Sequence, residues 1–299
     1  MTAPSFSRLD VTFDSDSDTC AAWLYLPDHV SNPPVVILGH GLGATREMGL
    51  AAFAERFAQA GIAALAFTYR HFGDSTGQPR QLLSITRQLA DWDAAIAHVK
   101  TRDDVDTSCI AVWGSSFGGG HAIIVAKRHP ELRAAISQCP FTDGLASALA
   151  LGPVESARLL PAVVGDLLAA ARSKEPVRIA LAGAPGSTAL MTAPDALPGY
   201  RALVPEDHTF VNEVAARVAP TITWHRPGRA AKDVAIPILF CICDRDSVTP
   251  PERTRAYAHT APMGEVKTYD AGHFEIYSGD AFEVAVADQT DFLLRHLKD

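Results

Sequence analysis

The chain has 299 residues, of which 47% are hydrophobic and 20% charged, and its formal net charge is -8. This length fits one large α/β domain, or one domain with an inserted subdomain. The acidic balance and the absence of Lys/Arg-rich runs argue against nucleic acid or an anionic membrane surface as a partner. No apolar run of about 18 or more residues occurs, so the sequence predicts no transmembrane helix.

The five cysteines are Cys20, Cys109, Cys139, Cys241 and Cys243, and four of the five lie in or beside apolar, strand-like runs. No Cys-x-x-Cys or Cys/His zinc spacing is present, so we expect no metal and no cofactor. Buried, reduced thiols are typical of cytoplasmic proteins. The first residues show no basic region followed by an apolar core, so no signal peptide is predicted and the expected location is the cytoplasm.

The first part of the chain predicts strands and helices in alternation. Loosely alternating segments around an Asp/Ser turn indicate a hairpin, and continuous apolar runs indicate strands covered on both faces. Apolar residues at helical spacing mark the segments between those runs. In chain order, the sequence predicts hairpin strands over 8–13 and 19–26, a strand over 35–38, a helix over 48–60, a strand over 62–69 and a helix over 83–100.

The next buried strand, over 110–113, stops at a glycine and leads into a helix. The turn reads Gly114-Ser115-Ser116-Phe117-Gly118, with Ser116 at the centre of a Gly-x-Ser-x-Gly pattern. In a strand–turn–helix context this pattern is typical of a nucleophile elbow. Such a turn needs small residues two positions either side of the nucleophile, because strand and helix backbones nearly touch. Ser115 lacks glycines at both of those positions, so Ser116 is the candidate.

After a strand over 134–139 the alternation stops at about residue 141 and resumes at 236. The resumed part predicts a strand over 236–243, a helix over 251–261, a strand over 265–269 and a helix over 281–297. The interval is too long for a plain loop and shows no strong buried strand. Its helical stretches, 147–172 and 212–217, indicate an inserted, mainly helical cap over 145–232. Residues 1–144 and 233–299 then form an α/β core domain with a mostly parallel sheet and helices on both faces.

A serine hydroxyl becomes a useful nucleophile when a base, usually histidine, takes its proton and a carboxylate orients that base. Downstream of the elbow, the strand over 236–243 ends in an acidic turn that contains Asp244 and Asp246. The next strand leads to His273. In mostly parallel sheets, ligands bind beyond the carboxyl ends of the strands, where all these residues fall. The order Ser, Asp, His belongs to the α/β-hydrolase scaffold.

Five motifs in the right order make the chain resemble an α/β-hydrolase over nearly its whole length outside the cap. They are Gly39-His40-Gly41-Leu42-Gly43, the loop over 69–77, Gly114-Ser115-Ser116-Phe117-Gly118, Asp246-Ser247-Val248-Thr249-Pro250 and Gly272-His273-Phe274. The segments over 140–144 and 212–217 resemble, more weakly, bacterial hydrolases related to X-prolyl-peptidase-like and polyketide-transferase-like enzymes. A serine at the elbow excludes the branches that use an aspartate nucleophile.

The resemblance implies a role for each matching residue. Ser116 matches the nucleophile and His273 the general base and acid. Asp246 matches the orienting acid, because a short turn containing Val and Pro follows it, although Asp244 remains a competitor. The oxyanion-hole donors would be the backbone N–H groups of Phe117 and Leu42.

The expected substrate pocket is mostly apolar because the cap is rich in Ala and Leu. His40, Phe274 and Trp224 are its candidate lining residues, with His40 favoured as a residue that orders the oxyanion loop rather than as a base. These features predict a serine esterase that cleaves small to medium hydrophobic carboxylic esters through an acyl-enzyme. Acyl transfer, thioester hydrolysis or peptidase activity on the same triad, or a non-catalytic binding role, remain alternatives. A homo-oligomer is left open.

Overall fold

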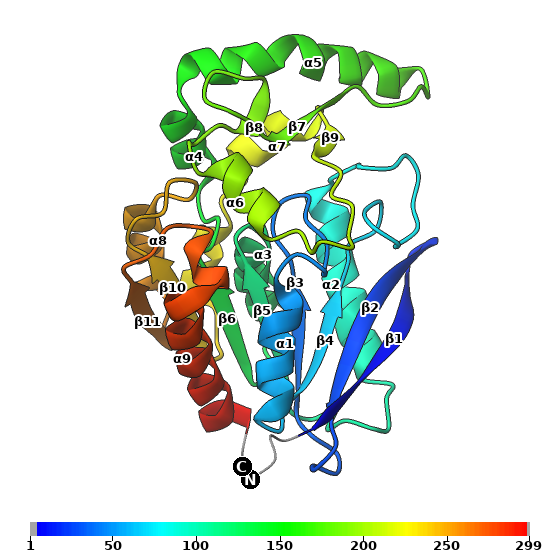
Figure 1. Cartoon of the computed structure of the whole chain (residues 1–299), viewed down its shortest axis with the longest axis vertical. Helices are drawn as coiled ribbons and strands as arrows, with labels where there is room; N and C mark the ends of the chain where they lie inside the picture. Colours follow the sequence, from blue (N-terminus) through cyan, green and yellow to red (C-terminus); the bar gives the residue numbers. More distant parts are fainter. Residues whose placement is uncertain (1–4, 298–299) are drawn as a thin grey trace.

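The computed structural model describes residues 5–297 and is built on an eight-stranded sheet (Figure 1). The spatial order is β1 (Phe6–Ser15), β2 (Asp18–Pro27), β4 (Ala63–Phe67), β3 (Val35–Gly39), β5 (Ile110–Ser115), β6 (Ala134–Gln138), β10 (Ile238–Cys243) and β11 (Gly264–Tyr269). β1 pairs with β2, and β2 with β4, in antiparallel fashion, and every other pair is parallel. The predicted α/β class with a mostly parallel sheet is confirmed.

The five central strands of this sheet, β4, β3, β5, β6 and β10, are buried at every position because helices cover both faces of the sheet. On one face, residues of α1 (Leu50–Gln59) and α9 (Gly279–Leu297) pack around Trp113. On the other, α2 (Ile85–Val99), α3 (Phe117–Arg128) and α8 (Pro251–Ala258) complete a second core that contains Trp92. Continuous apolar strands are what such a two-sided sheet requires.

Residues 145–232, here called the inserted segment, contain a second sheet that the sequence analysis did not predict. The helices that lie in this segment or overlap its ends are α4 (Gly144–Leu151), α5 (Pro153–Ala171), α6 (Ala196–Ala202), α7 (Val218–Trp224) and the 3-10 helix η1 (Pro227–Asp233). The sheet has the order β8 (Ala189–Met191), β7 (Arg178–Ala182), β9 (Glu213–Ala215). Strands of three to five residues carry too little periodicity to be read from sequence.

The helix predicted over 212–217 is wrong, since β9 occupies that stretch. Its backbone pairs antiparallel with β7, and the Asn212 side chain bonds both the N–H and the C=O of Ala182 at 3.0 and 2.7 Å. Pairing with β7 thus overrides the helical propensity of this short segment. The long helix over 147–172 is present as α4 and α5, which are separated at Gly152, while Pro161 lies inside α5 without ending it.

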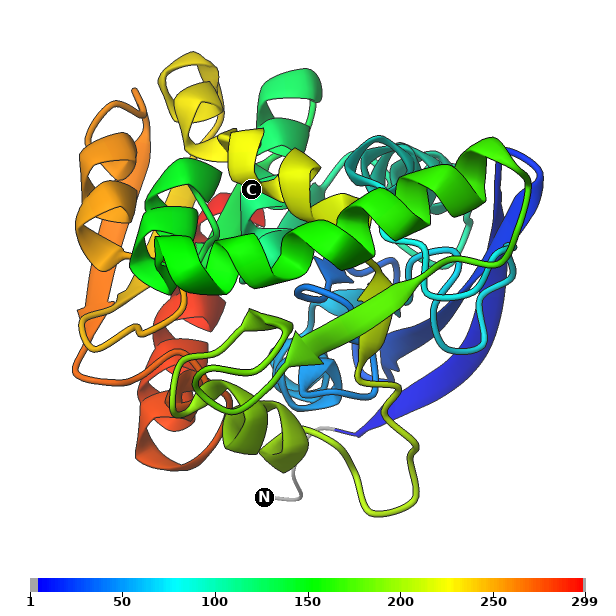
Figure 2. The same cartoon turned by 90° about the horizontal axis from the view of Figure 1, so that it is seen from above.

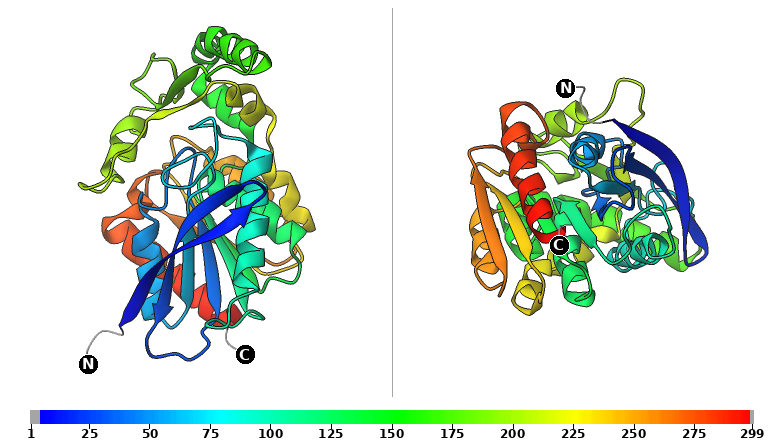
Figure 3. Two further views of the ribbon diagram at one scale, coloured as in Figure 1. Left: turned by 90° about the vertical axis from the view of Figure 1, so that its right-hand side faces the viewer. Right: turned by 90° about the horizontal axis from the view of Figure 1, so that it is seen from below.

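The inserted segment lies beyond one end of the central strands (Figure 3). Asp143 anchors its base, capping the first turn of α4 and accepting a hydrogen bond from the Tyr257 hydroxyl at 2.8 Å. It also pairs with Arg226 at 3.6 Å and Arg253 at 3.3 Å. Burial acts to raise the pKa of Asp143, but these donors and cations hold it below its ordinary value. A single ionised carboxylate therefore joins both ends of the insertion to α8.

Candidate active site

Ser116 occupies the tight turn between β5 and α3. Its backbone has φ 56° and ψ -117°, a conformation that L-residues rarely adopt. A Cβ atom at Gly114 would lie 2.0 Å from the Gly118 carbonyl oxygen, and one at Gly118 would lie 2.5 Å from that of His40. Both positions therefore require glycine, because the clashing atoms are backbone. The strand, turn and helix predicted around Ser116 are all present.

The structure brings Ser116, His273 and Asp246 together from the ends of three different strands. The Nε2 atom of His273 lies 3.0 Å from the Ser116 Oγ, and its Nδ1 lies 2.7 Å from the Asp246 Oδ2. The Oδ1 of Asp246 accepts the backbone N–H groups of Val248 and Thr249 at 2.8 and 2.7 Å. The carboxylate is thus fixed by its own turn, and a hydroxyl, an imidazole and a carboxylate form one buried hydrogen-bonded chain.

Two opposing effects set the charge of His273. Burial disfavours the imidazolium, but the Asp246 carboxylate outweighs this and raises the pKa of His273 to about 9. The same carboxylate would stabilise the imidazolium that forms when the ring accepts a proton from Ser116.

Asp244 and Asp246, the two candidates for the orienting acid, differ in their contacts. Asp244 is exposed and forms an ion pair with Arg255, whereas the Asp246 side chain is buried against His273. Of the two, Asp246 is the one bonded to the imidazole.

The two predicted oxyanion donors lie on either side of Ser116. Phe117 opens α3, and the first N–H groups of a helix have no partner within it. Leu42 follows Gly41, where an added Cβ would lie 3.5 Å from the Ser116 Oγ, so this loop packs directly against the serine. The hydroxyl of Tyr200, from α6, donates a 2.6 Å hydrogen bond to the Leu42 carbonyl. Sequence reasoning missed Tyr200 because nothing in the local pattern marks a contact across the inserted segment.

His40 is buried and neutral. Burial lowers its pKa to about 3, and its ring lies between the Gly41 carbonyl, 3.0 Å from Nδ1, and the Tyr69 N–H, 3.4 Å from Nε2. These contacts order the loop that carries Leu42.

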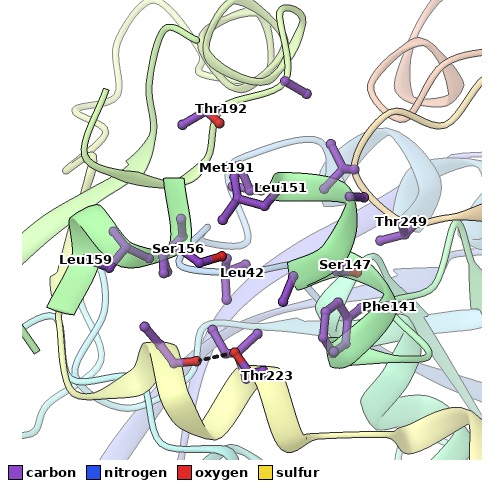
Figure 4. Close-up of a pocket in the computed structure, with 18 of the residues that line it drawn as sticks. Leu42, Phe141, Ser147, Leu151, Ser156, Leu159, Met191, Thr192, Thr223 and Thr249 are labelled. Carbon is purple, nitrogen blue, oxygen red and sulfur yellow. Dashed lines mark hydrogen bonds between the residues drawn. The ribbon is translucent and has the colours of Figure 1, made fainter. Parts of the chain in front are cut away.

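A pocket of about 600 Å³ opens beside Ser116, between the sheet and the inserted segment (Figure 4). Among the described residues, none of those that line it is ionisable. Its walls include Leu42, Phe117, Phe141, Ala148, Leu151, Leu159, Val163, Met191 and Ile222, with hydroxyls from Ser147, Ser156, Thr192, Thr223 and Thr249. Of the three predicted lining residues, Trp224 is present and remains 72% exposed, whereas His40 and Phe274 line a separate small cavity next to Ser116 and His273.

A buried polar chain supports the elbow from below. The Trp113 indole N–H donates to Gln289 at 2.8 Å, and the Gln289 amide donates to Gln138 at 2.7 Å. The Gln138 amide then donates to the Ser115 hydroxyl at 3.1 Å, and its backbone carbonyl accepts the Ser116 N–H at 2.9 Å. This chain links α9 to the nucleophile turn. It could not be found from sequence, because Gln289 looks like an ordinary polar position of an amphipathic helix.

The fold and site define a serine-hydrolase scaffold, and comparison with known proteins identifies the family. The family profile described as "Serine aminopeptidase, S33" matches residues 31–279. The chain is 48% identical over 287 residues to the "Quorum-quenching protein AidA" of Acinetobacter baumannii (strain MDR-ZJ06), covering 96% of this chain and 94% of that protein. The chain therefore belongs to the α/β-hydrolase superfamily, within the serine aminopeptidase S33 family.

More distant proteins support the same fold. The "Thiohydrolase aneE" of Aspergillus aculeatus is 25% identical over 287 residues, covering 90% of this chain and 87% of that protein. The crystal structure of the α/β hydrolase GrgF from Penicillium sp. sh18 superposes with a TM-score of 0.85 at 23% identity, covering 98% of this chain and all of that one. Among residues 5–297, no helix is long and apolar enough to span a membrane.

Proposed function

We propose that the protein is a serine hydrolase that cleaves carboxylic esters of small to medium hydrophobic substrates through an acyl-enzyme. The observation that carries the proposal is the buried Ser116–His273–Asp246 chain at the wall of an apolar pocket without an ionisable lining residue. Such a pocket favours a neutral acyl group over a charged peptide.

In the proposed mechanism the Ser116 Oγ attacks the ester carbonyl while the Nε2 of His273 takes its proton. The N–H groups of Phe117 and Leu42 would receive the developing oxyanion, and Asp246 would stabilise the imidazolium. His273 then returns the proton to the leaving alcohol, which departs and leaves Ser116 acylated. A water molecule, deprotonated by the same imidazole, attacks the acyl-enzyme and releases the carboxylic acid.

The name of the 48% identical relative narrows the ester class that we propose to test first. A hydrolase that inactivates a diffusible signal must cut a labile acyl bond in it, and a lactone is a cyclic ester open to the same serine attack. An acylated lactone would place its apolar chain in the 600 Å³ pocket and its ring carbonyl at Ser116. We therefore include acylated lactones among the candidate substrates.

The second candidate function is thioester hydrolysis or acyl transfer on the same triad, favoured by the relative named thiohydrolase. Peptidase activity is a weaker alternative because the pocket offers no charged group to a peptide. We also propose a cytoplasmic location, since all five cysteines are free and buried.

Active-site labelling and a substrate panel test the proposal. A fluorophosphonate should label the wild-type protein and the Ser115→Ala variant, but not Ser116→Ala. The panel should contain p-nitrophenyl esters, acylated lactones, acyl-CoA thioesters and prolyl amides, with turnover highest for the oxygen esters. Preference for thioesters or amides would replace ester hydrolysis by an alternative, and absence of labelling in the wild type would favour a non-catalytic binding protein.

A further inference from the structure

The turn over 246–250, here called the acid turn, brings the side chain of Thr249 against the carboxylate of the triad. The Thr249 Oγ1 donates a 2.8 Å hydrogen bond to the Asp246 Oδ2, the same oxygen that lies 2.7 Å from the His273 Nδ1. The Thr249 backbone N–H donates to the other oxygen, Oδ1, at 2.7 Å. Thr249 therefore contacts both oxygens of the carboxylate, and its hydroxyl shares one of them with the imidazole.

Thr249 lies between the triad and the substrate pocket. It is 3% exposed, and it lines the pocket of about 600 Å³ that Ser116 also lines. Seen from above, the acid turn leads into α8 beside α4, and both the turn and α4 supply pocket wall (Figure 2). Water therefore has little access to the bond between Thr249 and Asp246. A hydrogen bond shielded in this way is electrostatically stronger than an exposed one.

The single proton of the Thr249 hydroxyl points to the carboxylate. Two acceptors are within reach, the Asp246 Oδ2 at 2.8 Å and the Cys139 carbonyl oxygen at 3.3 Å. Oδ2 is nearer and carries negative charge, and hydrogen bonds to charged acceptors are the stronger ones. The side chain is also hard to turn away, because branching at Cβ restricts its χ1 angle and the following Pro250 restricts its backbone.

We propose that Thr249 is a positioning residue of the triad, which acts on His273 through Asp246. This inference rests on the proposed function of a serine hydrolase. With backbone N–H groups on Oδ1, the hydroxyl on Oδ2 keeps the carboxylate from rotating away from the imidazole. It also offsets part of the negative charge on the shared oxygen, so the imidazole is a weaker base than it would be beside an uncompensated carboxylate.

The charged groups that face His273 fix the direction of this second effect. Burial disfavours the imidazolium, whereas Asp246, Cys139 and Asp195 of the inserted segment favour it. The Thr249 hydroxyl opposes those three groups, because its hydrogen carries a partial positive charge beside the shared oxygen. Removing the hydroxyl should therefore stabilise the imidazolium, and the pKa of His273 should rise.

Thr249→Val tests the proposal, because it removes the hydroxyl and nearly keeps the shape of the side chain. NMR titration of the enzyme labelled with ¹⁵N-histidine measures the pKa of His273 without any substrate, and His273→Gln identifies the signal. Thr249→Val should raise this pKa by about half to one pH unit. Thr249→Ser keeps the hydroxyl and should stay close to wild type.

The matched control is Thr254→Val, the same exchange at another buried threonine. Thr254 is 2% exposed, and its hydroxyl bonds the Thr142 hydroxyl at 3.1 Å and the Pro140 carbonyl at 3.4 Å. Thr254→Val should leave the pKa of His273 unchanged. Circular dichroism of every variant checks that its fold is intact.

The rate of fluorophosphonate labelling as a function of pH gives a second readout. At neutral pH, Thr249→Val should react at least about 3-fold more slowly than wild type, because more of its His273 is protonated. A role in packing alone would lower the urea midpoint of Thr249→Val without moving its His273 titration. The inference is overturned by a His273 pKa that stays or falls in Thr249→Val, by a Thr249→Ser variant that behaves like it, or by an equal shift in Thr254→Val. Lack of turnover on every ester would instead refute the proposed function, and the NMR titration would still decide the role of Thr249.

Discussion

Replacing Asp246 by asparagine tests the proposed mechanism, because the neighbouring Asp244 supplies a matched control. In the wild type the Asp246 Oδ2 lies 2.7 Å from the His273 Nδ1, and Oδ1 accepts two backbone N–H groups. The asparagine carbonyl must keep those two N–H donors, so its NH₂ group faces Nδ1. Nδ1 then becomes an acceptor and Nε2 carries the proton, which is the tautomer that cannot take a proton from Ser116.

The expected loss in kcat is about 10³–10⁴-fold, the size seen when a triad carboxylate becomes an amide with the geometry kept. This corresponds to roughly 4–5.5 kcal/mol of transition-state stabilisation, at 1.36 kcal/mol per tenfold change. Asp244→Asn removes the same charge two residues away but touches only the exposed Arg255 pair, so its activity should stay within about twofold of wild type.

The assay is steady-state hydrolysis of a p-nitrophenyl ester as a function of pH. His273 must be neutral to act as a base, and its pKa is raised to about 9, so kcat/KM of the wild type should rise with pH through about 9. The Asp246 carboxylate makes the largest contribution that raises the pKa of His273, so without its charge the residual activity should rise at a lower pH. Equal losses in both asparagine variants, or a pH profile that does not move in Asp246→Asn, would refute this account of His273.

Three further predictions concern the groups around the triad. Tyr200→Phe removes the hydroxyl that holds the Leu42 carbonyl, and should lower kcat about 10-fold or more with little change in KM, a split that ester hydrolysis kinetics would reveal. Gly118→Ala forces a Cβ to within 2.5 Å of a backbone oxygen and should cost at least about 3 kcal/mol in urea unfolding, whereas Gly165→Ala, with only Val177 nearby at 3.5 Å, should be neutral or stabilising. Gln289→Leu leaves Gln138 and Trp113 without their buried partner and should cost about 2–3 kcal/mol of stability, measured by the same unfolding curves; an unchanged midpoint would contradict the supporting role.

Sequence reasoning reached the core sheet and the three residues now found in contact, because each of them follows a buried strand with a recognisable turn. In an α/β chain, continuous apolar runs indicate strands that are buried on both faces. The glycines of the Gly-x-Ser-x-Gly turn can be recognised in the sequence, because the close approach of strand and helix there requires small residues. The choice between Asp244 and Asp246 could not be derived from physics alone. It depends on which carboxylate turns inward, and only the fold shows that Arg255 holds Asp244 at the surface.

The inserted segment was harder to predict for the opposite reason. Its strands have three to five residues, and its key contacts, such as Asn212 with Ala182 and Tyr200 with Leu42, join positions about 30 and 158 residues apart. No local pattern records such pairs. A large separation along the sequence also explains why the role of Gln289 was not predicted, since its amide bonds Gln138, 151 residues away.

The core domain supplies the catalytic triad, whereas the inserted segment supplies most of the substrate pocket. Ser116, His273 and Asp246 all come from the core, and their hydrogen bonds involve no residue of the inserted segment. Most of the pocket wall, by contrast, is supplied by α4, α5, α7 and the loop after β8. Substitutions there can change which acyl group is accepted while leaving the triad intact. Tyr200 is the exception, because its hydroxyl reaches from the inserted segment to the carbonyl of Leu42, so a substitution at Tyr200 would also affect the chemistry.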